Sequence, residues 1–136
     1  KNQEGTAAAF AGHWYKTGDV ARLDQDGYLY IVDRTKDMIV TGGENVYSKE
    51  VEDAIAGHPG VMESAVIGRP HPQWGETVAA LVVPRPGAAL SEDDLKEFLA
   101  DKLARYKIPK IVNFVEELPH TPSGKVKKYE LRQTEQ

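Results

Sequence analysis

The sequence contains no cysteine and no long hydrophobic run. Without cysteine it forms no disulfide, no thiolate zinc site and no cysteine nucleophile, and we expect a cytoplasmic protein because this composition suits a reducing compartment. No apolar run approaches the roughly 18 residues that a transmembrane helix needs, and the first residues lack signal-peptide character. The four histidines are scattered without metal-ligand spacing. We therefore expect neither a transmembrane segment nor a metal site built by the protein.

The sequence has fewer basic than acidic residues, with a formal net charge of -4, but its basic residues are concentrated near the C-terminus. Residues 105–132 hold seven basic and three acidic residues, a local charge of +4, which leaves -8 on the remainder. A basic region on an acidic protein indicates a phosphate-bearing partner, although a merely solvated surface explains the charge equally well. Nucleic acid is not the expected partner, because interleaved aromatic residues and a positive overall charge are both missing.

The first third of the chain predicts a hairpin followed by a hinge. Residues 1–12 are polar and alanine-rich, without strand or helix-cap signals. Two apolar strands at 20–23 and 28–33 flank the turn sequence at 24–27, which is typical of a β-hairpin. The charged stretch 33–37 then separates two apolar segments, and such a solvated junction favours a hinge.

The remaining patterns predict a small layered domain. Further strands are expected at 38–41, 61–67, 78–83 and 111–115, and helices at 49–56 and from 91 to about 104. Ser48 and Ser91 are the predicted N-caps. Strand 78–83 is apolar throughout and is expected to be central, whereas 68–76 reads as a long, proline-stiffened connection. The predicted fold class is α+β, a small and mostly antiparallel sheet covered by two main helices and preceded by a β-hairpin.

Three short motifs carry candidate chemistry, each beside a simpler alternative. The loop Pro119–Lys125 presents a lysine behind a glycine, which suits a polyanion, but a solvated turn lysine is the simpler interpretation. Asp19 is either a loop aspartate satisfied by its own backbone or a carboxylate that binds ribose hydroxyls. Gly42 and Gly43 either form a plain tight turn or allow close approach of the backbone to a ligand.

Five elements, in the right order, resemble the C-terminal end of the acyl-adenylate-forming enzymes. This superfamily includes acyl- and aryl-CoA synthetases, adenylation domains of nonribosomal peptide synthetases, and firefly luciferase. The elements are YKTGD at 15–19, GYLY with DRTKDMI at 27–39, GGENVY with EVE at 42–52, YKIPK at 106–110, and PHTPSGK at 119–125. The resemblance implies a ligase that makes acyl-AMP and pyrophosphate from a carboxylic acid and MgATP, and then transfers the acyl group to coenzyme A.

The resemblance also implies a role for each matching residue. Lys125 matches the lysine that supplies positive charge to adenylation, and it resembles a lysine that an acyltransferase modifies in relatives. Asp19 matches the ribose-binding aspartate, and Arg34 an arginine near the same ribose. Lys36 matches the hinge about which the domain turns between the two half-reactions.

Coenzyme A is expected to contact a separate set of residues. The Gly42-Gly43-Glu44 loop matches the lining of the pantetheine channel. The residues expected near the CoA nucleotide are Trp74, Tyr106, Lys107 and Lys110. For Trp74, a buried core position is an equal alternative.

Domain organisation follows from the same resemblance. Residues 1–33 are expected to be the end of a large N-terminal domain, and residues 34–136 a mobile C-terminal lid. The phosphate loop and the acyl pocket belong to that larger domain, so the chain alone is expected to be inactive and its acid substrate stays open. The alternatives are the lid of a carrier-protein-dependent adenylation domain and a stand-alone nucleotide- or CoA-binding module.

Overall fold

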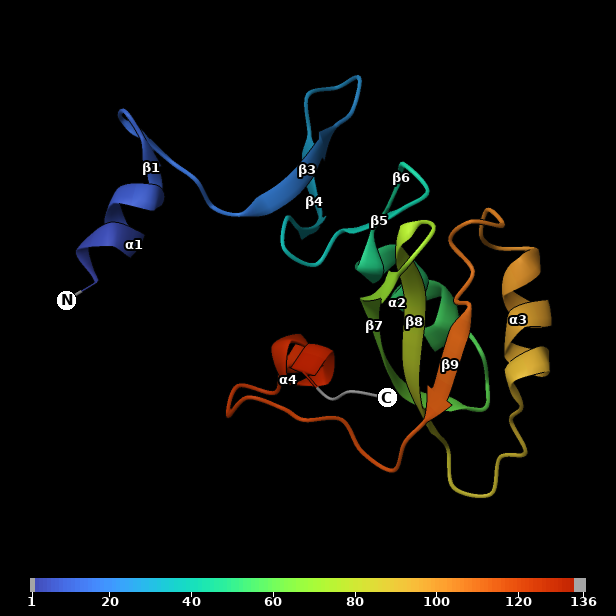
Figure 1. The fold of residues 1–136 in the computed structure, drawn as a ribbon. Helices are drawn as coiled ribbons and strands as arrows, with labels where there is room; N and C mark the ends of the chain where they lie inside the picture. Colours follow the sequence, from blue (N-terminus) through green and yellow to red (C-terminus); the bar gives the residue numbers. More distant parts are fainter. Residues whose placement is uncertain (1, 134–136) are drawn as a thin grey trace. The chain divides into compact units, whose positions relative to one another are not determined.

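The computed structural model describes residues 2–133. Two compact units divide the chain, Lys1–Lys36 and Asp37–Gln136, and each is described by itself (Figure 1). The strand that ends at Arg34 belongs to the first unit, and the division between the two units follows Lys36. No helix among the described residues is long and apolar enough to cross a membrane.

The first unit contains one short helix and two small hairpins. Its elements are α1 (Gln3–Ala8), β1 (Phe10–Ala11), β2 (Trp14–Tyr15), β3 (Asp19–Leu23) and β4 (Leu29–Arg34). Residues 1–12 showed no helix-cap signal in the sequence, but the Asn2 side chain accepts a hydrogen bond from Gly5 N at 2.8 Å and caps α1. The β3–β4 hairpin is confirmed, and Asp24 Oδ1 closes its turn by accepting from the backbone of Tyr28 and Asp26.

This first unit buries almost nothing. Its large apolar side chains are exposed, among them Phe10, Trp14, Tyr15, Leu23, Tyr28, Leu29, Tyr30 and Ile31. Between residues 2 and 36, the only buried residue is the aspartate Asp33. A patch of this kind is typical of a surface that another protein body covers.

The second unit is built on a five-stranded sheet. The strands are β5 (Ile39–Thr41), β6 (Glu44–Val46), β7 (Val61–His71), β8 (Gly75–Pro84) and β9 (Ile111–Phe114). Their order is β6-β5-β8-β7, and β9 also pairs with β8. Only the β8–β9 pair is parallel, so the predicted mostly antiparallel sheet is confirmed.

The β7–β8 hairpin is longer than the sequence pattern predicts. Residues 68–76 are not a long connection, because pairing continues from Val61 to a final pair between His71 and Gly75. Pro70 is tolerated because β7 lies at the edge of the sheet, where a missing backbone donor costs least. The remaining turn is short and carries Trp74.

Side chains of β8 alternate between two apolar clusters, which confirms that this strand is central and covered on both faces. On one face, α2 (Ser48–Ala56) and α3 (Glu92–Ala100) pack against Val78, Ala80 and Val82. The other face consists of Ala79, Leu81 and Val83. It is covered by Leu118 of the loop after β9 and by Leu131 of α4 (Lys128–Gln133). The two predicted main helices are therefore present, although α3 ends at Ala100, and α4 was not predicted because it has only one buried residue.

The two predicted N-caps have different outcomes. Ser91 forms a complete capping box with Asp94, as expected. Ser48 is not a cap but the first residue of α2, where it is fully buried and its hydroxyl accepts a hydrogen bond from Lys128 Nζ at 2.8 Å. The prediction was wrong here because the partner of Ser48 is 80 residues away in the sequence.

Candidate functional site

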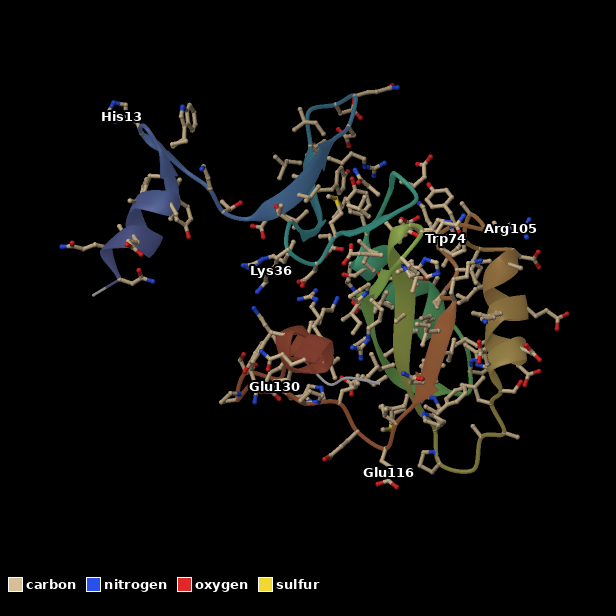
Figure 2. The ribbon with its side chains drawn as sticks, in the orientation of Figure 1. His13, Lys36, Trp74, Arg105, Glu116 and Glu130 are labelled. Carbon is tan, nitrogen blue, oxygen red and sulfur yellow. The ribbon has the colours of Figure 1, made fainter. Side chains whose placement is uncertain are left out.

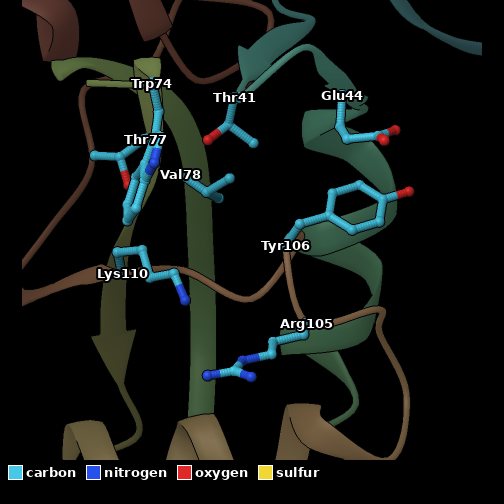
Figure 3. Close-up of a pocket in the computed structure, with 9 residues that line it drawn as sticks. Thr41, Glu44, Trp74, Thr77, Val78, Arg105, Tyr106 and Lys110 are labelled. Atoms are coloured by element: carbon cyan, nitrogen blue, oxygen red, sulfur yellow. The ribbon is translucent and has the colours of Figure 1, made fainter. Parts of the chain in front are cut away.

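A pocket of about 460 Å³ opens on the second unit at the turn of the β7–β8 hairpin (Figure 3). We call it the Trp74 pocket. It is lined by Thr41, Gly42, Glu44, Trp74, Thr77, Val78, Arg105, Tyr106 and Lys110. Five of the residues expected to contact coenzyme A lie here, namely Gly42, Glu44, Trp74, Tyr106 and Lys110. Gly43 and Lys107 do not line it.

Glycine shapes one rim of the Trp74 pocket. Gly42 and Gly43 form the turn between β5 and β6 with φ of 59° and 87°, values that other residues adopt only with strain. The tight turn is therefore confirmed. Gly42 N donates a hydrogen bond to Trp74 O at 3.0 Å, so the turns of two hairpins are joined at this rim.

The Trp74 indole stands at the surface with one face supported. Trp74 is 39% exposed, which excludes the alternative of a buried core position. The His71 ring stacks on it with centroids 4.4 Å apart and an interplanar angle of 9°. His71 Nδ1 also accepts from the backbone N–H groups of Gln73 and Trp74, which holds the turn in shape. Such a supported aromatic plane suits stacking of a flat ligand, and His71 had no sequence signal for this role.

Two cations and a second aromatic ring complete the pocket. Figure 3 shows the rings of Trp74 and Tyr106 on two sides, with the charged ends of Lys110 and Arg105 directed below them. The backbone of Lys110 is fixed to the sheet, since its N–H donates to Val78 O at 2.9 Å. Aromatic walls beside exposed cations suit a ring system that carries phosphate. Sequence reasoning missed Arg105, although it directly precedes the YKIPK element.

Lys107 faces a protein carboxylate instead of the pocket. Its ammonium donates to both oxygens of Glu50, at 2.7 and 2.8 Å, and its side chain is only 19% exposed. The hydrogen bond to Glu50 raises the pKa of Lys107 above its ordinary value. Lys107 and Lys110 belong to one motif but have different surroundings, because Lys107 pairs with Glu50 and Lys110 lines the Trp74 pocket.

The floor of the pocket includes a hydroxyl that the protein leaves unsatisfied. Thr77 is 3% exposed, and its Oγ1 is the one buried side-chain oxygen or nitrogen without a hydrogen-bond partner among residues 2–133. Thr77, Val78 and Thr41 were not predicted as site residues, because a strand pattern does not distinguish a pocket wall from a core wall.

Lys125 lies at the end of a closed turn in the loop between β9 and α4. Thr121 N donates to Lys125 O at 2.8 Å, and Lys125 N donates to Thr121 Oγ1 at 3.1 Å. Gly124 has a φ of 80°, which the turn requires. The lysine side chain is exposed, and no ion pair of its ammonium occurs within the described part of the chain. Lys125 does not line the Trp74 pocket.

The two expected nucleotide residues meet in the first unit. Asp19 and Arg34 are opposite each other in the β3–β4 register, and Arg34 Nε lies 3.0 Å from Asp19 Oδ1. Lys36 lies in the turn that follows β4 and is exposed (Figure 2). Among residues 2–133, no group of three or more His, Asp or Glu side chains is arranged to hold a metal ion.

Residues 50–125 match the AMP-binding enzyme C-terminal domain family. The chain belongs to this family. The resemblance drawn from the five sequence elements is therefore confirmed, and with it the expected fold class.

Relatives of this AMP-binding enzyme C-terminal domain include CoA ligases. The chain is 50% identical over 129 residues to a feruloyl-CoA synthase of Amycolatopsis sp., covering 95% of this chain and 26% of that protein. It is 51% identical over 130 residues to the long-chain-fatty-acid–CoA ligase FadD13 of Mycobacterium tuberculosis, covering 96% and 26%. The chain thus spans about a quarter of the length of these relatives.

A solved structure has the same fold. ATP-bound MatB from Rhodopseudomonas palustris matches with a TM-score of 0.88 and 45% sequence identity, over 96% of this chain and 26% of that one.

Proposed function

We propose that this AMP-binding enzyme C-terminal domain is the lid of an AMP-forming acyl-CoA synthetase. The complete enzyme converts a carboxylic acid, ATP and CoA into acyl-CoA, AMP and pyrophosphate, and Mg²⁺ arrives with ATP. One observation carries this proposal. The second compact unit presents two separate candidate sites, the exposed Lys125 turn and the Trp74 pocket. The match to CoA ligases along nearly the whole chain supports the same reaction.

Lys125 serves the adenylation half-reaction. A carboxylate attacking the α-phosphate of ATP brings like charges together, and a fixed cation lowers the free energy of that transition state. Its ammonium stands on a closed turn and forms no ion pair within residues 2–133, which makes it available for this task. The same exposure suits regulation, because an acyltransferase that acylates Lys125 would remove its charge.

The Trp74 pocket serves the thioester-forming half-reaction by holding the nucleotide end of coenzyme A. Trp74 and Tyr106 offer aromatic surface to the adenine, and Lys110 and Arg105 offer charge to the phosphates. The Gly42-Gly43-Glu44 turn lies at the same rim and lines the pantetheine channel. A carrier protein presents a pantetheine arm without the adenine nucleotide, so this pocket favours CoA over a carrier protein as the acyl acceptor.

Residues 1–33 belong to a larger N-terminal domain, which is the main partner of the lid. The exposed aromatic and aliphatic side chains of the first unit support this assignment, since they need an apolar surface to cover them. Asp19 accepts the ribose hydroxyls of ATP there, and Arg34 orients its carboxylate. Lys36 is the hinge, and residues 34–136 turn about it between the two half-reactions. We place the enzyme in the cytoplasm, and the cysteine-free composition of this chain is compatible with a reducing compartment.

The half-reactions of the complete enzyme test the proposal. Lys125→Ala is expected to slow pyrophosphate release by several orders of magnitude, while CoA still reacts with supplied acyl-AMP. Lys102→Ala, which removes an exposed lysine two residues after the end of α3, is the control and is expected to leave both steps unchanged. Equal loss of both half-reactions in Lys125→Ala contradicts the division of labour. A screen of pyrophosphate release with fatty, short-chain and aromatic acids identifies the acid.

A further inference from the structure

Lys128, three residues after Lys125, turns back into the domain. Its side chain is 16% exposed, and its ammonium lies 2.7 Å from Glu52 Oε1 on α2. The same ammonium donates to Ser48 Oγ at 2.8 Å. The first residue of α4 is therefore attached to α2 by an ion pair and a hydrogen bond, both largely shielded from water.

Glu52 extends this attachment to the sheet. Its carboxylate is also 16% exposed and accepts a hydrogen bond from Val66 N of β7 at 2.8 Å. The Lys128 ammonium is thus held by a group that is itself fixed between α2 and β7. We call Lys128, Glu52 and Ser48 the α4 anchor.

The other end of the Lys125 loop is fastened to the same strand. His120 Nε2 lies 2.6 Å from Glu63 Oε1 of β7. Between the two attachments the loop closes on itself, because Lys127 N donates to Pro119 O at 2.8 Å and His120 pairs with Val126. Lys125 therefore stands on a short loop that is fixed at both ends. Beyond this loop, α4 is also held by the buried Leu131 and by Arg132 Nη2, which lies 2.6 Å from Asp37 Oδ1.

A shielded ion pair of this kind is a poor source of net stability. Removing two charges from water costs free energy that their attraction often fails to recover, and apolar replacements of both partners are frequently neutral or stabilising. Its directional geometry, in contrast, sets where the backbone on either side lies. The α4 anchor is therefore better explained by orientation than by stability.

We propose that Lys128 is a positioning residue for adenylation, which fixes the Lys125 turn relative to the sheet through the α4 anchor. The inference rests on the proposed function, since it assigns a task to Lys125. The lid turns as one body, so the place at which Lys125 meets the α-phosphate depends on how firmly its loop is attached. A misplacement of about 1 Å at a reacting group costs on the order of 100-fold in rate.

The experiment compares variants of the complete enzyme in the two half-reactions. Lys128→Met keeps the aliphatic stem and removes the charge, and it is expected to slow pyrophosphate release about 10- to 100-fold. Thioester formation from supplied acyl-AMP is expected to stay within about twofold, because that step needs the same folded domain but not the Lys125 turn. Lys128→Arg keeps the charge in a different geometry. It is expected to slow pyrophosphate release by an intermediate factor and to leave the unfolding temperature of the enzyme unchanged.

The double variant Lys128→Met with Glu52→Gln separates position from stability. It removes both charges and leaves an oxygen to accept from Val66 N, so the unfolding temperature is expected to recover while adenylation stays slow. Recovery of adenylation together with stability overturns the inference, as does equal loss of both half-reactions in Lys128→Met. If Lys125→Ala abolishes adenylation and Lys128→Met does not, only the inference fails. If Lys125→Ala leaves adenylation intact, the proposed function fails and the inference with it.

Discussion

Asp19 and Arg34 face each other across the β3–β4 hairpin, with Arg34 Nε 3.0 Å from Asp19 Oδ1. An arginine that pairs with a carboxylate limits the rotation of that carboxylate, so its second oxygen is held in one direction. Two residues separated by 15 positions thereby form one ion pair, and this pairing suits the ribose contact that we propose for Asp19.

Asp19→Asn in the complete enzyme is expected to raise the KM for ATP about 10- to 100-fold, because a hydrogen bond to a charged group contributes roughly 1.5–3 kcal/mol. Initial rates of pyrophosphate release at varied ATP give this value. Asp26→Asn changes an exposed aspartate in the turn of the same hairpin and is the matched control. An unchanged KM in Asp19→Asn removes this residue from the ATP site.

Lys36→Pro is expected to block the change between the two half-reactions while each orientation stays folded. Proline locks φ and restricts the preceding Thr35, so the turn loses the backbone freedom that a hinge needs. Steady-state acyl-CoA formation should fall at least about 100-fold, whereas one half-reaction measured separately is retained. Lys36→Ala keeps backbone freedom and is expected to turn over normally. Full turnover by Lys36→Pro would falsify the hinge.

Lys110→Ala is expected to weaken CoA binding, whereas Lys107→Ala is expected to lower the stability of the domain. Loss of Lys110 removes a cation from the Trp74 pocket and should raise the KM for CoA about tenfold, equivalent to about 1.4 kcal/mol, without changing the KM for pantetheine, which lacks the nucleotide. Loss of Lys107 leaves the KM for CoA unchanged and lowers the free energy of unfolding by about 1 kcal/mol, because its partner is Glu50. A matched rise in both KM values for Lys110→Ala argues against nucleotide binding at this pocket.

The Ser91–Asp94 capping box predicts a pH dependence of stability. Hydrogen bonds from the Ser91 side chain and backbone lower the pKa of Asp94 below 3.8. The box therefore contributes stability above pH 3.8, and this contribution is lost as the pH falls through the lower pKa of the folded state. Urea unfolding of the 136-residue chain and of Ser91→Ala should differ clearly at pH 7. The two curves should approach each other below pH 3.8, and a difference that is constant with pH contradicts the assigned cause.

Local features were predictable because the residues that form them are neighbours. The β3–β4 hairpin follows from its turn sequence, the Gly42-Gly43 turn from two residues without side chains, and the α3 cap from a serine three positions before an acid. The family was predictable for a similar reason, since the order of short motifs along the chain can be recognised without knowing how they are arranged in the tertiary structure.

The surroundings of each residue depended on contacts between distant segments. Ser48 reads as a helix cap and is in fact a buried partner of Lys128, and Lys107 reads as a pocket cation but is paired with Glu50, 57 positions away. Arg105 and Thr41 enter the Trp74 pocket only because the sheet brings the end of β5 beside the segment before β9. The sequence by itself determined the fold class, the family and the candidate lysine at 125. The tertiary structure decided which charges are free for a ligand, because the partner that neutralises a charge is chosen by distance in space and not by position in the chain.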